Sequence, residues 1–121
     1  MSARDRRSLA KARRVHAPVF AALGDETRLA VVRRLGGGVP LSATTLSSGA
    51  KVTRQAIVKH LQVLEGAGLV SHEKRGREVL YSLEARRLDE ARAFIEAVSA
   101  GWDRAIERLR QQVEKPKKRR A

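Results

Sequence analysis

Residues 41–83 hold the pattern that most restricts the fold of this chain. Ser42 and Thr53 are favourable N-cap residues, and each precedes a segment of helical composition. Two short runs with β-type composition then follow, at 70–74 and 79–83, on either side of a glycine between charged residues. This order predicts a short helix, a turn and a second helix, followed by a two-stranded hairpin.

The second of these helices is expected to run from Thr53 to about residue 67, and its two faces differ. Apolar residues recur at spacings of four and three residues and form one buried stripe: Ile57, Leu61 and Leu64. Polar residues point the opposite way: Gln55, Lys59 and Gln62. Such a helix can enter the major groove of DNA, where Gln pairs with adenine edges, Arg with guanine edges, and Lys with guanine or phosphate. An ordinary amphipathic helix with a solvated polar face is the alternative interpretation of this pattern alone.

The tip of the predicted hairpin is basic. It carries Lys74, Arg75 and Arg77 around a glycine that favours a tight turn. A basic two-stranded wing can lie along the DNA backbone or enter the minor groove. Together with the preceding helix, the hairpin favours DNA contact over a simple exposed turn.

The rest of the chain is expected to add helices over residues 16–23, 26–35 and 85–113, with Asp25 as the N-cap of the second. The helix over 26–35 is expected to bury Leu29, Val32 and Leu35. The last helix carries apolar residues at spacings of three and four, with Trp102 in its middle, and this stripe is longer than so small a domain can bury. The predicted fold is therefore mainly α-helical with a small β-hairpin wing, a winged helix-turn-helix that forms a homodimer through its first and last helices.

Positive charge is concentrated at the two ends of the chain and in one internal segment, residues 51–77, and the formal net charge of the chain is +13. Residues 1–14 hold six basic residues and one acidic residue, and residues 115–120 hold five basic residues. We therefore expect a basic N-terminal arm or frayed helix start (1–14), one domain (15–113) and a basic C-terminal tail (114–121). The tails are expected to add sequence-independent affinity for a nucleic acid, although basic tails also serve simply as solvated surface.

Several classes of protein are excluded or disfavoured by what the sequence lacks. It contains no cysteine, which excludes disulfides, thiolate metal sites and thiol redox switches. It has no apolar run of about 18 to 20 residues, the length that a membrane span requires, and it has no secretory signal. A cytoplasmic protein without a membrane partner is therefore expected. No Gly-rich phosphate loop in a strand–helix context and no His–carboxylate pair at a workable spacing is present, so we do not expect an enzyme.

Three runs, VFAALGDETRLAVVRRL (19–35), VTRQAIVKHLQVLEGAGLV (52–70) and GREVLYSL (76–83), resemble the arsenic-repressor (ArsR/SmtB) family of winged helix-turn-helix regulators. The resemblance implies a dimeric transcriptional repressor that binds a palindromic operator on double-stranded DNA and releases it on an inducing signal. It also implies DNA contacts from the recognition helix and the wing, at Thr53, Arg54, Gln55, Lys59, His60, Lys74, Arg75 and Arg77. For His60, which lies beside the buried stripe, packing or a phosphate contact is favoured over metal ligation.

The sequence departs from the family's metal sensors at both of their metal-binding places. The predicted third helix lies in LSATTLSSG (41–49), which has no thiol, and the last helix has carboxylates but no histidine. Zinc and soft metals prefer thiolate or imidazole ligands. We therefore expect a member of the non-metal-sensing branch with no metal and no cofactor, and we leave its inducer open. The alternatives are a nonspecific nucleoid-type DNA-binding protein, a regulator whose metal or small-ligand site is not recognisable, and a protein-interaction module.

Overall fold

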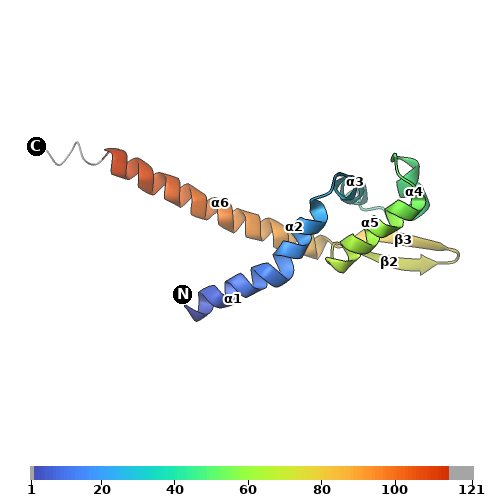
Figure 1. The fold of residues 1–121 in the computed structure, drawn as a ribbon, viewed down its shortest axis with the longest axis horizontal. Helices are drawn as coiled ribbons and strands as arrows, with labels where there is room; N and C mark the ends of the chain where they lie inside the picture. The colour runs from blue at the N-terminus through green and yellow to red at the C-terminus, as the bar shows by residue number, and fades with distance from the viewer. Residues whose placement is uncertain (1, 115–121) are drawn as a thin grey trace, which may run out of the picture.

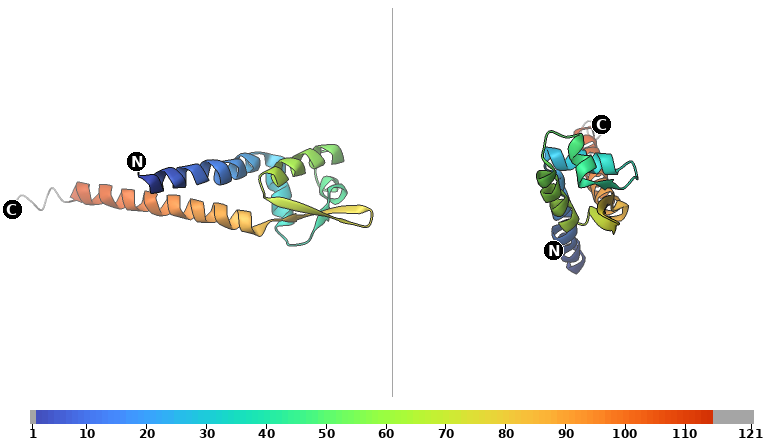
Figure 2. Two further views of the ribbon diagram at one scale, coloured as in Figure 1. Left: turned by 90° about the horizontal axis from the view of Figure 1, so that it is seen from below. Right: turned by 90° about the vertical axis from the view of Figure 1, so that its right-hand side faces the viewer.

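The computed structural model describes residues 2–114, and within them a mainly helical fold with one small antiparallel sheet. In chain order the elements are α1 (Ala3–Lys11), the π-helical turn η1 (Ala12–His16), α2 (Ala17–Leu23), α3 (Glu26–Leu35), β1 (Leu41–Ser42), α4 (Ala43–Ser48), α5 (Arg54–Gly66), β2 (Val70–Arg75), β3 (Glu78–Leu83) and α6 (Ala85–Glu114). Figure 1 shows α2–α5 and the sheet gathered at one end of the molecule, a unit that we call the head (residues 17–83). From the head, α1 and α6 extend in the same general direction but diverge, as the views in Figures 1 and 2 show.

Three helices of the head, α3, α4 and α5, begin at capping side chains that the sequence predicts. The side chains of Asp25, Ser42 and Thr53 each accept a hydrogen bond from the backbone N–H group three residues further on. Each cap satisfies one of the N–H groups that a helix leaves without a partner in its first turn. The starts of α3, α4 and α5 are therefore set locally, by the residue types that precede them.

The core of the head is formed by apolar side chains from α2–α5 and β2. The predicted stripe of α5 is confirmed, because Ile57, Leu61 and Leu64 are each 0% exposed. The expectation for Leu29 of α3 was wrong, since this side chain is 52% exposed while Val31 and Leu35 are buried. Successive helical residues are rotated by about 100°, so Leu29 lies about 200° around the helix from Val31, almost on its opposite side. Val31 faces the side of α3 that packs on α2 and α5, and Leu29 therefore points away from the core.

The sheet has three antiparallel strands in the order β1-β3-β2, one more than expected. The predicted hairpin is present, with Val70 opposite Leu83 at its base and Arg75 opposite Glu78 at its tip. Its turn uses Gly76 at a φ of +61°, a conformation that a residue with a Cβ rarely adopts. The additional strand, β1, is two residues long and pairs Ser42 with Leu80, so it ties the start of α4 to the wing.

The N-terminal segment is helical over most of the length that was expected to be an arm or a frayed helix start. Ser2 and Asp5 form a reciprocal capping box at the start of α1. The helix then continues through η1 into α2, and His16 at the end of η1 is buried, with its ring 4.7 Å from that of Phe94 in α6. Of the predicted basic tail 114–121, all but Glu114 lies outside the described residues.

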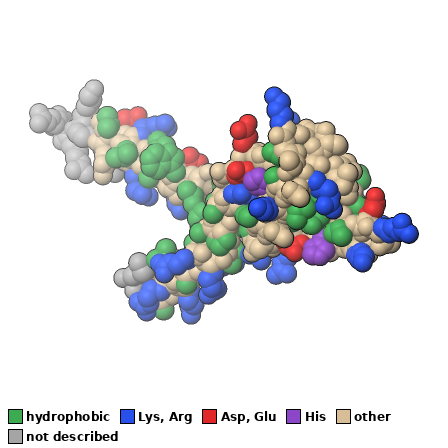
Figure 3. All heavy atoms as spheres, turned by 45° about the vertical axis from the view of Figure 1, so that its right-hand side comes forward, with side chains coloured by type: hydrophobic (Ala, Val, Ile, Leu, Met, Phe, Trp, Pro, Cys, Tyr) green, Lys and Arg blue, Asp and Glu red, His purple; other side chains and the backbone are tan. Residues whose placement is uncertain are grey.

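The last helix, α6, is 30 residues long and begins and ends within one residue of the expected limits. Ala91 is its single buried residue, and the part beyond residue 94, which we call the stem (residues 95–114), exposes large apolar side chains. Figure 3 shows hydrophobic side chains on the surface of this projecting helix. Among residues 2–114, no helix combines the length and apolar composition needed to cross a membrane.

Candidate nucleic-acid interface

The exposed side of α5 is formed by the polar residues of its first turns. Thr53 caps the helix, and Arg54, Gln55 and Lys59 are exposed, while the opposite side of α5 is buried against the core. The short helix α4 packs on α5, which gives the head a helix-turn-helix with α5 as its second helix. The orientation expected for Gln55 and Lys59 is therefore confirmed. Neither side chain is covered by another part of the chain that the structure describes.

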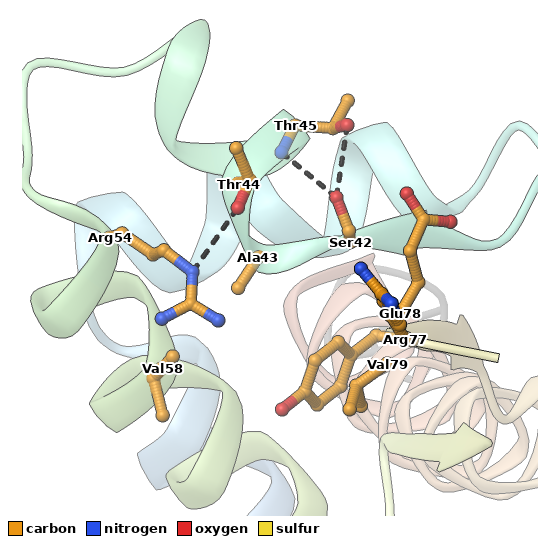
Figure 4. Close-up of a pocket in the computed structure, with 10 residues that line it drawn as sticks. Ser42, Ala43, Thr44, Thr45, Arg54, Val58, Arg77, Glu78 and Val79 are labelled. Atoms are coloured by element: carbon orange, nitrogen blue, oxygen red, sulfur yellow. Dashed lines mark hydrogen bonds between the residues drawn. The ribbon is translucent and has the colours of Figure 1, made fainter. Parts of the chain in front are cut away.

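Arg54 differs from its neighbours because its side chain is held by the preceding helix. Its Nε donates a hydrogen bond of 3.1 Å to the hydroxyl oxygen of Thr44 in α4. Figure 4 shows the guanidinium beside a hollow between α4, α5 and the wing, and the volume of this hollow is about 470 Å³. Arg77 of the wing lines the same hollow, which brings together two cations that lie far apart in the sequence.

The three predicted cations of the wing are exposed, but they do not form one cluster. Successive residues of a strand point to opposite faces, so Lys74 and Arg75 lie on different sides of the hairpin. Arg75 lies 3.7 Å from the carboxylate of Glu73 and opposite Glu78 in the strand register. The ion pair is exposed and contributes little to stability, but it places a negative charge beside Arg75.

Comparisons with known proteins agree with this architecture. A family model described as "Helix-turn-helix domain" matches residues 23–73. The "HTH-type transcriptional regulator Rv2034" of Mycobacterium tuberculosis is 36% identical over 85 residues, which cover 70% of this chain and 76% of that protein. The solved structure of an "ArsR-like Transcriptional Regulator from Rhodococcus sp. RHA1" is 40% identical, covers 81% of this chain and 91% of its own, and superposes with a TM-score of 0.70. The chain belongs to the ArsR family of transcriptional regulators.

A third similar protein supports the fold of this ArsR-family regulator. It is the solution structure of the "homodimeric winged helix-turn-helix DNA-binding domain" Mb0332 from Mycobacterium bovis, which is 20% identical. The match covers 83% of this chain and 88% of that one, with a TM-score of 0.60. At this identity the likeness concerns the fold, and it confirms the winged helix-turn-helix architecture predicted from the sequence.

His60 of the regulator faces its own domain, in contrast to Gln55 and Lys59. Its Nδ1 lies 3.3 Å from Nη1 of Arg28 and 3.8 Å from the carboxylate of Asp25, both at the start of α3. Arg28 also donates from Nε to the carbonyl oxygen of Ala22 at 2.6 Å. The group joins the α2–α3 turn to the middle of α5. His60 therefore ties α5 to the start of α3, and these contacts hold its ring on the side of α5 that faces the head.

The same group lowers the pKa of the Asp25 carboxyl below its usual value. The main cause is the hydrogen bond from the backbone N–H of Arg28, and the positive charges of Arg28 and His60 act in the same direction. Burial opposes these effects, but the net shift is downward. The negative charge of Asp25 at the N-terminus of α3 is thereby favoured in the folded regulator.

Two residues of this interface were not predicted. Thr44 holds Arg54, and Arg28 holds His60 across 32 positions of sequence. No spacing within one helix could reveal either pair, because each joins two different elements. The candidate interface therefore combines exposed side chains on α5 and the wing with polar contacts from α3 and α4.

Proposed function

We propose that the chain is a repressor that binds an inverted-repeat operator on double-stranded DNA as a homodimer. Gln55 and Lys59 contact base edges in the major groove, and the wing contacts the backbone or minor groove with Lys74, Arg75 and Arg77. One observation carries this proposal: Gln55 and Lys59 are exposed on the side of α5 opposite its fully buried stripe. A recognition helix contacts base edges with its N-terminal residues, which is where these side chains lie.

The homodimer is supported by the apolar surface of α6. Val98, Trp102 and Leu109 are 57%, 67% and 62% exposed, and they recur along one face at spacings of four and seven residues. A contiguous apolar face of this kind marks a contact with another protein surface. Pairing of two copies across α6 and the N-terminal helix covers it, and it presents two recognition helices about 34 Å apart, one turn of DNA.

The proposal includes no metal ion and no cofactor. The two helices that serve metal sensing elsewhere in the family correspond to α4 and α6, and here both lack thiolate and imidazole ligands. The inducing signal is left open. Because its partner is the DNA of the cell, the proposal includes a cytoplasmic location, and no catalytic role is assigned to any residue.

The test is a selection of bound fragments from genomic DNA with the purified protein, followed by binding to the selected duplex and to a random duplex. We expect an inverted repeat whose half-sites lie one helical turn apart and at least a thousandfold preference over random DNA, about the lower limit for specific binding. Equal affinity for both duplexes would instead indicate a nonspecific nucleoid-type protein.

Two variants link the preference to α5. Gln55→Ala and Lys59→Ala should each reduce the preference by about tenfold or more, as loss of a base contact does. Gln62→Ala is the matched control, since Gln62 is exposed on the same helix one turn further from its N-terminus. A double variant of Gln55 and Lys59 that keeps full preference would exclude α5 as the recognition helix.

A further inference from the structure

The hollow between the recognition helix and the wing is lined by groups suited to an anion. Its walls come from the start of α4, the first turns of α5 and the tip of the hairpin (Figure 4). Two arginines, Arg54 and Arg77, line it. Four residues with hydroxyl groups line it as well, Ser42, Thr44, Thr45 and Tyr81, of which Ser42 already donates its hydrogen to the Thr45 hydroxyl oxygen. One carboxylate, that of Glu78, lines it as well. The charged groups at the hollow therefore sum to +1, from two cations and one anion.

Arg54 is held at the hollow with most of its donors unused. Its Nε is bonded to Thr44 Oγ1, and within residues 2–114 its two terminal nitrogens have no hydrogen-bond partner. The contact with Thr44 directs the guanidinium toward α4 and away from a straight outward extension from α5. An arginine that reads a guanine must extend into the groove with both terminal nitrogens aligned on the base edge. The contact with α4 disfavours that arrangement.

Arg77 approaches the hollow from the opposite side. It follows Gly76, whose positive φ sets the direction of the turn, and it is exposed at the tip of the wing. A guanidinium presents paired N–H donors that match two oxygens of one phosphate. A site bounded by two such groups suits a phosphate, whose oxygens point in several directions, better than the edge of one base, whose acceptors all lie in one plane.

We propose that Arg54 and Arg77 together bind one backbone phosphate of double-stranded DNA in this hollow. The inference rests on the proposed DNA-binding function and refines it. Arg54 sets the position of the recognition helix on the backbone and does not read a guanine, the base with which arginine commonly pairs in the major groove. Thr44 is a positioning residue that acts through Arg54. Glu78 lowers the affinity of the site for the phosphate, because its charge repels the ligand.

The salt dependence of DNA binding measures how many phosphates the site neutralises. The slope of log K against log salt falls by about 0.9 for each phosphate contact that is lost. The double variant R54A/R77A should therefore flatten the slope by about 1.8 for a dimer, one phosphate per subunit, whereas two separate phosphates would double that change. Arg108→Ala, which removes one exposed cation from the stem, should leave the slope unchanged. A doubled change would overturn the shared site.

Base preference separates a phosphate contact from a base contact. Arg54→Ala should weaken binding to the operator and to random duplex by the same factor, about tenfold, because every duplex has the phosphate. Thr44→Val should give a smaller uniform loss and none in the R54A background, while Thr44→Ser should bind like the wild type. Glu78→Gln should strengthen binding to all duplexes. A selective loss of operator affinity in Arg54→Ala would show that Arg54 reads a base, and would overturn the inference.

Neutral backbone substitution locates the phosphate itself. Operator duplexes with a single methylphosphonate at successive positions should include one position that weakens the wild type as much as R54A/R77A does, and that weakens R54A/R77A no further. If no position behaves in this way, the inference fails. If instead the wild-type protein shows no preference for any duplex, the proposed function itself fails, so the two failures are distinguishable.

Discussion

The head and the stem of this regulator bury their apolar residues to very different degrees. In the head, Ile57, Leu61, Leu64 and Leu69 are each 0% exposed, and the core that they form is completed within the same chain, with Ala91 from the start of α6. In the stem, large apolar side chains of the same helical spacing lie open, with Trp102 67% exposed. The same helical spacing of apolar residues is therefore buried in one region and exposed in the other, and the difference depends on which elements pack against each stripe. A stripe within the head is covered by its own chain, whereas the stripe of the stem requires a second one.

The largest expected effect is on the stability of the head. Leu61→Ala removes a fully buried side chain and leaves a cavity, which should lower the free energy of unfolding by about 3 kcal/mol. The measurement is chemical denaturation at a protein concentration that keeps the chain monomeric. Leu109→Ala, the same change on the exposed stem, should cost less than about 0.5 kcal/mol there. Equal costs at the two sites would remove the distinction between the head and the stem.

The second prediction concerns the assembly. Trp102→Glu places a charge in the middle of the exposed apolar face, and it should weaken the dimer by at least about 30-fold, as loss of a central aromatic contact does. Sedimentation over a range of concentrations measures the change, and the far-UV spectrum of the head should stay the same. Asp103→Asn, at the neighbouring exposed position, should leave the dimer intact. A wild-type chain that stays monomeric at micromolar concentration would contradict the dimer.

A smaller effect is expected where the head holds its recognition helix. Arg28→Ala removes the hydrogen bonds to the Ala22 carbonyl and to His60, and should cost about 1 kcal/mol of stability. Operator affinity should fall further than stability alone explains, because α5 loses its contact with the α2–α3 turn. Arg33→Ala, an exposed arginine on the same helix, is the control for removing charge. An operator affinity that is unchanged at full folding would show that this contact does not position α5.

The smallest effect is the acid dependence of the head. The folded pKa of Asp25 is lowered, so its carboxylate stabilises the head above the unfolded value near 3.8, and this contribution is lost as the pH falls through the lowered folded value. Asp25→Asn keeps the N-cap acceptor but cannot titrate. The melting temperature of this variant should therefore fall less than that of the wild type between about pH 5 and about pH 2. Asp89→Asn on α6 is the control. An identical fall in the wild type and Asp25→Asn would contradict the role of this carboxylate.

Local features of the sequence predicted most of the head. The stripe of α5 and the caps at Asp25, Ser42 and Thr53 depend on residues within one helix, and all were confirmed. Leu29 was wrongly placed because several apolar residues of α3 fit a helical stripe, and its tertiary neighbours decide which side packs. Strand β1 was missed because it has only two residues, too few to show the alternation of apolar and polar side chains that indicates a strand. Its partner β3 also lies far along the chain.

The candidate site was predictable in part for the same reason. That Gln55 and Lys59 face outward follows from the stripe of their own helix. The hollow could not be foreseen, because it depends on how the wing folds back beside α5 and brings Arg77 near Arg54. The inward direction of His60 likewise depends on Arg28, a residue of another helix. Pairs of this kind are set by packing, on which the spacing of residues carries no information.

Ser42 belongs to two elements at once, and this limits how the head can adapt to its target. Its backbone pairs with Leu80 in the sheet, and its hydroxyl caps α4, so the hairpin and the helix-turn-helix meet at one residue. The hairpin therefore cannot tilt without pulling on α4, and the span between groove-facing and backbone-facing contacts is nearly constant. A duplex whose groove width departs from that span must itself deform, and the energy of deformation depends on its base sequence. If α5 and the wing bind DNA as proposed, the join at Ser42 makes the shape of the duplex a further source of selectivity, even at base pairs that no side chain touches.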